Sequence, residues 1–128
     1  MPAAFEPGDI LGAVFSGRVD GQIKVRPVLY WMRHKKNTKL ILVSGTFGTV
    51  TGREWELKLF PKPDNGLTKE CVLRLDDTVY IGEDAIIRIL GRLNVFELVE
   101  AKNMLIQYSS HIKENSPQDF DDDIFSVF

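Results

Sequence analysis

Short segments of alternating apolar and polar residues constrain the fold of this chain more than any other feature. In the segment 53–60, Trp55, Leu57 and Leu59 alternate strictly with three charged residues. A period of two places side chains on opposite faces of an extended strand, so this segment is predicted to be a half-buried antiparallel strand. Further strands are expected from β-type composition in segments 8–15, 23–31, 40–43, 71–76 and 85–93.

Turn-forming residues separate these segments. Asp20 and Gly21 predict a hairpin turn between the first two strands. Pro27 lies within the second strand although proline donates no ladder hydrogen bond, so we expect it at an edge, a bulge or a strand end. The prolines and glycine of residues 61–66 predict a long turn before the later strands.

One segment near the end has helical periodicity. Asn94 and Glu97 have the spacing of a capping box, and apolar positions such as Leu98 and Leu105 then share one face. We therefore predict a helix over residues 95–109. Many short strands with one terminal helix indicate an α+β, mostly β fold, in which a small twisted, barrel-like antiparallel sheet packs against a C-terminal helix.

Length and charge divide the chain unevenly. A chain of 128 residues can form one domain with its own core, which we expect to span residues 1–113. All 16 lysines and arginines and 13 of the 18 acidic residues lie there, which gives a net charge of +3, whereas residues 114–128 carry −5. We expect this acidic segment to be a flexible tail. The mildly basic body permits binding of a phosphate chain without indicating it.

Other features exclude several classes of protein. No segment has the apolar length of a membrane span, and the first residues lack the pattern of a secretory signal, so a cytoplasmic location is expected. Cys71 is the single cysteine, which excludes an internal disulfide, and we expect it to be a small core residue. His34 and His111 have no ligand-like spacing to a carboxylate or cysteine, so no zinc site is expected.

Five short motifs, in matching order, resemble the PemK/MazF family of type II toxins. They are PGDI at residues 7–10, RPVL at 26–29, ILVSGT at 41–46, GL at 66–67 with VLRLD at 72–76, and LGRL at 90–93. The resemblance spans roughly residues 7–107. It implies a CcdB/PemK-type fold that forms a homodimer and binds RNA across the two subunits.

The resemblance also implies an activity. Such toxins are metal-independent, sequence-specific endoribonucleases that cleave single-stranded messenger RNA. The 2′-hydroxyl of the substrate attacks the neighbouring phosphate and leaves a 2′,3′-cyclic phosphate and a 5′-hydroxyl end. The implied partners are single-stranded RNA, a cognate antitoxin protein and a second copy of the chain, and no cofactor is implied.

Internal attack on a phosphate needs a base, an acid and cations around the phosphorane. By resemblance Arg26, Thr46, Arg74 and Asp76 are the catalytic candidates, with Asp76 as the base. Arg74 and Asp76 are two residues apart on an expected strand, which predicts that they project from one face. Arg74 would stabilise charge, Arg26 would bind phosphate oxygens through its planar fork, and Thr46 would position the phosphate. Without the resemblance, the same residues fit a solvated salt bridge, a surface cation and a turn residue.

A second group of residues is predicted to contact RNA: Arg18, Lys24, Ser44, Phe47 and Arg53. Some family members carry a catalytic histidine in the first hairpin loop, which residues 16–24 here lack, so its role is vacant or passes to Arg18 or Lys24. Phe47 stands where the family often has serine, and its ring could stack on a base.

Tyr30 and Trp31 are further aromatic candidates for base contacts. Trp31 and Trp55 fit a core or a dimer interface equally well.

Two other functions share the expected fold. The CcdB toxins poison DNA gyrase through residues after their helix, and the aspartate-rich ending here does not resemble those residues. A catalytically silent RNA- or protein-binding module is the main alternative. We also hypothesise that residues 119–128 occupy the RNA groove of the same subunit or its partner, as the acidic and apolar segment of a family antitoxin does. A solvated tail is the alternative.

Overall fold

The computed structural model describes residues 4–16, 23–48 and 50–115. Its elements are β1 (Asp9–Ser16), β2 (Ile23–Arg33), β3 (Leu40–Phe47), β4 (Glu56–Leu59), β5 (Cys71–Gly82), the 3-10 turn η1 (Glu83–Ala85), β6 (Ile86–Arg92) and α1 (Val95–Asn115). The strands form one six-stranded sheet in the order β4-β5-β3-β2-β1-β6, and every neighbouring pair is antiparallel. The predicted mostly β architecture with a C-terminal helix is confirmed.

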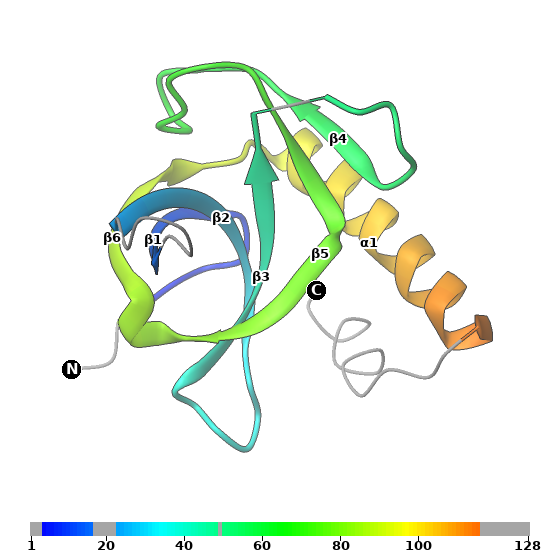
Figure 1. Cartoon of the computed structure of the whole chain (residues 1–128), viewed down its shortest axis with the longest axis horizontal. Helices are drawn as coiled ribbons and strands as arrows, with labels where there is room; N and C mark the ends of the chain where they lie inside the picture. Colours follow the sequence, from blue (N-terminus) through cyan, green and yellow to red (C-terminus); the bar gives the residue numbers. More distant parts are fainter. Residues whose placement is uncertain (1–3, 17–22, 49, 116–128) are drawn as a thin grey trace.

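The sheet is strongly curved, and its two faces bury separate cores. In Figure 1, β6, β1, β2, β3 and β5 follow one another around a ring, with α1 outside it beside β4 and β5. The face away from the helix buries Leu11, Ala13, Val28, Tyr30, Ile41 and Val43. The face toward the helix buries a larger group: Ile10, Leu29, Trp31, Leu42, Leu57, Leu59, Leu67, Cys71, Leu73, Leu75, Leu93, Ala101 and Leu105. The predicted alternation is confirmed over β4, where Leu57 and Leu59 are buried and Lys58 is exposed. The strand is shorter than the predicted segment 53–60, because Trp55 lies in a turn with a φ of 70°.

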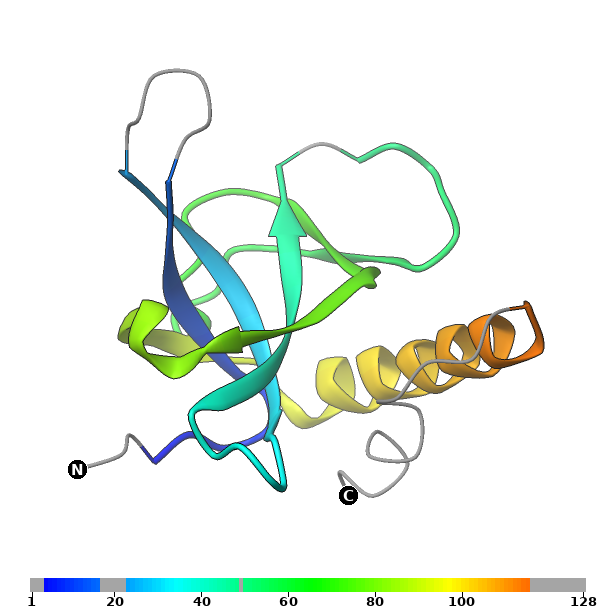
Figure 2. The ribbon, with the colours of Figure 1, turned by 60° about the horizontal axis from the view of Figure 1, so that its bottom comes forward.

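The helix begins with the predicted capping box. The backbone N–H of Glu97 donates to Asn94 Oδ1 at 2.8 Å, and the backbone N–H of Asn94 donates to Glu97 Oε1 at 3.2 Å. These bonds satisfy donors that a helix start otherwise leaves without partners. The helix continues past the predicted end at residue 109 to Asn115, and Figure 2 shows it as one long rod beside the sheet. Residues 119–128, which the hypothesis of a docked acidic tail concerns, lie outside the described residues.

Ion pairs near the start of the helix fasten β6 to β1. Arg92 Nε donates to Asp9 Oδ1 at 2.9 Å, so an arginine on β6 is bonded to the first residue of β1. Glu6 pairs with the same arginine at 2.7 Å. Gly91 packs against the backbone of residues 64–65, where a Cβ would overlap the chain. These contacts give Gly91 and Arg92 structural roles. Of the helices in the described part of the chain, none has the length and apolarity that a membrane crossing requires.

Candidate functional site

An open pocket of about 510 Å³ lies where β2 begins and β3 ends. Its walls come from three parts of the chain: Val25, Arg26 and Pro27; Thr46, Phe47 and Gly48; and Leu67, Thr68, Lys69, Cys71 and Arg74. A second, smaller pocket of about 80 Å³ shares part of this lining and adds Val28, Gly45 and Asp77. The structure thus brings together Arg26, Thr46, Phe47 and Arg74, four predicted site residues from separate segments of the chain.

Pro27 determines where the pocket opens. The ladder between β2 and β3 reaches only to the pair Val28–Gly45, because proline has no N–H with which to continue it. Beyond that pair, Thr46 Oγ1 donates to the Pro27 carbonyl oxygen at 2.7 Å. The Thr46 side chain therefore links β3 to β2 one step beyond the end of their ladder, next to Arg26. The prediction of an irregularity at Pro27 is confirmed.

Thr46 is 7% exposed, and its hydroxyl proton is engaged by Pro27. Its oxygen retains the capacity to accept a hydrogen bond. In this arrangement the hydroxyl fastens the strand that carries Arg26.

Arg74 is held in position from two sides. Its Nε donates to Glu56 Oε2 at 3.2 Å, and its guanidinium carbon lies 4.4 Å from the centre of the Phe47 ring. Glu56 is fixed in turn by the Thr51 hydroxyl at 2.7 Å and by the N–H groups of Thr51 and Gly52. The Thr51 hydroxyl is the main cause that lowers the pKa of Glu56, with a smaller contribution from Arg74. The terminal nitrogens of Arg74 donate to no described side chain, so they remain available to an anion.

The pocket carries further positive charge. Arg26 and Lys69 both line it, and within the described residues neither makes a hydrogen bond or an ion pair. A Cβ on Gly48 would lie 3.6 Å from Lys69 Nζ, which places the ammonium group over the end of β3. Lys69 was missed by the sequence analysis, although it lies in the short segment between the GL and VLRLD motifs.

A bulge in β5 changes the predicted arrangement of the carboxylates. On β3, Ser44 and Gly45 are neighbours, but their partners on β5 are Thr78 and Arg74, so three residues of β5 face a single step of β3. Regular alternation ends at this bulge. The expectation that Asp76 shares a face with Arg74 rested on that alternation, so the spacing no longer supports it. Asp76 is exposed and lines neither pocket.

Asp77 is the carboxylate that lies against the site. It lines the smaller pocket with Arg26 and Thr46, and a Cβ on Gly45 would overlap its Oδ2 atom. Burial raises the pKa of Asp77, Asp76 raises it further, and Arg74 and Arg26 act in the opposite direction. Sequence reasoning missed Asp77 because a bulge of this kind has no sequence signature beyond the adjacent aspartates.

The remaining RNA-contact predictions have mixed outcomes. Ser44 is fully buried, accepts a hydrogen bond from Trp31 Nε1 at 2.7 Å and shares another with Thr78 Oγ1 at 2.6 Å. The expectation that Ser44 contacts RNA is therefore wrong, because other protein atoms surround its hydroxyl. Tyr30 and Trp31 are buried at 5% and 0% exposure, so the expectation of base contacts from these rings is also wrong.

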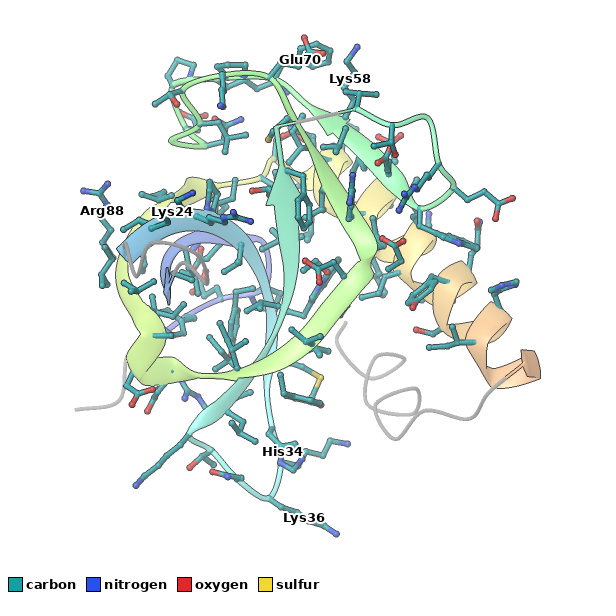
Figure 3. The ribbon with its side chains drawn as sticks, viewed as in Figure 1. Lys24, His34, Lys36, Lys58, Glu70 and Arg88 are labelled. Carbon is teal, nitrogen blue, oxygen red and sulfur yellow. The ribbon has the colours of Figure 1, made fainter. Side chains whose placement is uncertain are left out.

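The three basic residues that were predicted to contact RNA do not line the pockets or lie outside the described residues. Lys24 and Arg53 are exposed, but neither lines the two pockets. Figure 3 shows Lys24 on the part of β2 that lies far from the hairpin carrying His34 and Lys36. Arg18 lies outside the described residues. Cys71 is buried as predicted, and burial raises the pKa of its thiol.

No protein-family model matches the sequence, and no curated protein matches it either. Solved structures do match its fold. The toxin MazF-mt6 of Mycobacterium tuberculosis gives a TM-score of 0.60 at 23% identity, over 77% of this chain and 93% of that one. The MazE-MazF complex (Form-II) of Deinococcus radiodurans gives a TM-score of 0.68 at 16% identity, over 84% and 97% of the two chains.

A third solved structure also matches the fold. An endoribonuclease in complex with its cognate antitoxin, from a mycobacterial species, gives a TM-score of 0.61 at 14% identity, over 81% of this chain and 93% of that chain. Each match covers nearly all of the solved chain, and identity is low throughout. The chain therefore has the fold of MazF toxins, as its motifs predict.

Proposed function

We propose that this protein is a MazF/PemK-type toxin: a metal-independent, sequence-specific endoribonuclease that cleaves single-stranded messenger RNA in the cytoplasm. One observation carries the proposal. Arg26, Lys69 and Arg74 converge on one open pocket beside a half-buried carboxylate, within a fold that MazF toxins share. Internal transesterification requires cationic groups around the phosphate and a general base near the 2′-hydroxyl.

The roles of the cations follow from their contacts. Arg26 and Lys69 make no hydrogen bond or ion pair with a described residue, so a phosphate would displace no existing ion pair. Arg74 is oriented beforehand by Glu56 and Phe47, which lowers the entropic cost of its binding to the phosphorane. Because a guanidinium is a poor proton donor, Arg74 is assigned to charge stabilisation. Thr46 keeps Arg26 at the pocket by bonding the adjacent carbonyl.

The remaining groups contact the reacting ribose and the bases. The general base is one of the adjacent carboxylates Asp76 and Asp77. The half-buried ring of Phe47, which lines the pocket, is assigned to base stacking beside the phosphate site. Lys24 and Arg53, and Arg18 outside the described residues, would extend the cationic path for the RNA backbone.

We further propose that the protein acts as a homodimer and is neutralised by an antitoxin. An apolar patch is exposed on the first turns of α1, where Val95, Phe96 and Val99 are 72%, 85% and 49% exposed. Apolar surface of this kind commonly marks a protein interface. A MazE-MazF complex is among the solved structures that share the fold, which motivates a search for an antitoxin.

Cleavage of mixed-sequence single-stranded RNA in excess EDTA tests the function. Wild-type protein is expected to cleave, and Arg26→Ala and Arg74→Ala are each expected to lower the rate by about 10²- to 10³-fold, the usual cost of losing one stabilising group. Arg88→Ala is the matched control, because Arg88 is an exposed arginine on β6 that lines neither pocket. RNA binding without cleavage would overturn the nuclease and favour the silent binding module. Equal activity of all three variants would show that the chemistry lies elsewhere.

A further inference from the structure

We propose that Asp77, and not Asp76, is the general base that removes the proton from the attacking 2′-hydroxyl. The inference rests on the proposed function and names the carboxylate of that same site. Its basis is the bulge in β5, where three residues face the step from Ser44 to Gly45 on β3. The bulge turns Asp77 toward β3 and leaves Asp76 exposed to solvent.

Gly45 provides the space that Asp77 occupies. Any side chain at position 45 would begin with a Cβ that overlaps Asp77 Oδ2. The carboxylate thus lies directly against the backbone of β3, one residue before Thr46. Arg26, Thr46 and Phe47 line the same small pocket, so Asp77 is next to the groups that would hold the phosphate.

Buried hydrogen bonds keep the bulge in this form. Thr78 Oγ1 donates to the Leu75 carbonyl oxygen at 2.6 Å and so spans the bulge from its end to its start. Ser44 Oγ bonds Thr78 Oγ1, and Trp31 Nε1 bonds Ser44 Oγ. Three strands therefore hold the bulge through side chains in the core. A base must be placed within hydrogen-bond reach of its proton, and a rigid support of this kind provides such placement.

The carboxylate is also chemically available. Asp77 accepts no hydrogen bond and forms no ion pair with a described residue. It lies close enough to Arg26 and Arg74 for both charges to affect it. An ionised Asp77 can therefore accept a proton, while the two guanidinium groups remain directed at the phosphate.

The proposed step begins at the 2′-hydroxyl of the substrate. Asp77 takes the 2′-hydroxyl proton, the O2′ electron pair forms a bond to phosphorus, and the bond from phosphorus to O5′ breaks. O5′ takes a proton from water, and the resulting hydroxide takes the proton from Asp77. The products are a 2′,3′-cyclic phosphate and a 5′-hydroxyl, and the enzyme returns to its starting state.

The experiment compares single-turnover cleavage by the wild type, Asp77→Asn, Asp76→Asn and the exposed matched control Asp84→Asn. Asp77→Asn is expected to slow cleavage by about 10²- to 10⁴-fold, the range for loss of a general base, and Asp76→Asn to lose much less. Binding of an uncleavable 2′-deoxy analogue measures whether Asp77→Asn still holds RNA. Preserved binding with lost turnover is expected, because asparagine keeps the shape of the side chain and removes its basicity.

The pH profile gives a readout that a purely structural role would not change. The base must be ionised, so the wild-type rate is expected to fall as pH drops through the pKa of Asp77, which burial raises above the ordinary aspartate value. The charged groups that face Asp77 are Asp76 on its own strand, Arg74 on the same strand and Arg26 on β2. This fall in rate at low pH should disappear in Asp77→Asn and persist in Asp76→Asn.

A second variant, Gly45→Ala, tests the same assignment in case Asp77→Asn does not fold. Gly45→Ala leaves Asp77 in the chain but displaces its carboxylate, so it is expected to lower turnover as well. Loss of turnover in Asp76→Asn, with Asp77→Asn and Gly45→Ala active, would overturn the assignment and leave the proposed function intact. A wild-type protein that does not cleave RNA would overturn the proposed function itself.

Discussion

Replacing Ser44 with alanine should destabilise the fold, because the Ser44 hydroxyl is buried and bonds only other protein atoms. In the folded protein, Trp31 Nε1 donates to Ser44 Oγ at 2.7 Å, and both residues are 0% exposed. Alanine would leave this indole N–H buried without an acceptor. An unsatisfied buried donor costs about 1–3 kcal/mol. Thr78 keeps its bond to the Leu75 carbonyl, so we count a single lost donor.

Urea denaturation followed by tryptophan fluorescence measures this change. The free energy of unfolding of Ser44→Ala is expected to fall by about 1–3 kcal/mol, which corresponds to a Tm roughly 4 °C lower per kcal/mol for a domain of this size. Ser110→Ala is the matched control, because Ser110 is exposed on α1 and should change stability by less than about 0.5 kcal/mol. Equal stability of the two variants would refute the buried hydrogen-bond chain.

Two further predictions concern stability. Asn94→Ala removes the cap acceptor of the Glu97 N–H and should cost about 1 kcal/mol in a thermal melt, whereas Asn94→Ser should restore most of it. Because the pKa of Asp77 is raised in the fold, the stability that its neutral form contributes is present at acid pH and lost as pH rises through that pKa. Asp77→Asn should therefore be more stable than the wild type at neutral pH, with the difference vanishing in acid; an Asp77→Asn variant that is less stable at neutral pH would contradict the burial argument.

Much of the architecture could be predicted because it depends on local patterns. Alternation in segment 53–60 requires only that one face of a strand be buried, and Leu57 and Leu59 are buried in the core. The capping box at Asn94 and Glu97 involves residues three apart, so sequence spacing determines its geometry. The irregularity at Pro27 follows from the missing N–H of proline, whatever the tertiary structure.

The parts that could not be predicted depend on how distant segments meet. Whether Ser44 faces RNA or the core is decided by Trp31 and Thr78 on neighbouring strands. The choice between Asp76 and Asp77 depends on a bulge whose register is set by pairing with β3. Motif spacing identified Arg26, Thr46 and Arg74 but assumed regular strands, which is the assumption that the bulge breaks.

If the pocket promotes attack by the substrate's own 2′-hydroxyl, removal of that hydroxyl should prevent cleavage. Once the cut site is mapped, an RNA with a single 2′-deoxyribose on the 5′ side of the scissile phosphate is compared with the unmodified RNA. We expect the unmodified RNA to give a 2′,3′-cyclic phosphate and a 5′-hydroxyl end, and the modified RNA to stay intact at that position. Cleavage of the modified RNA at the same position would contradict this expectation, because the attacking oxygen would then have to come from water.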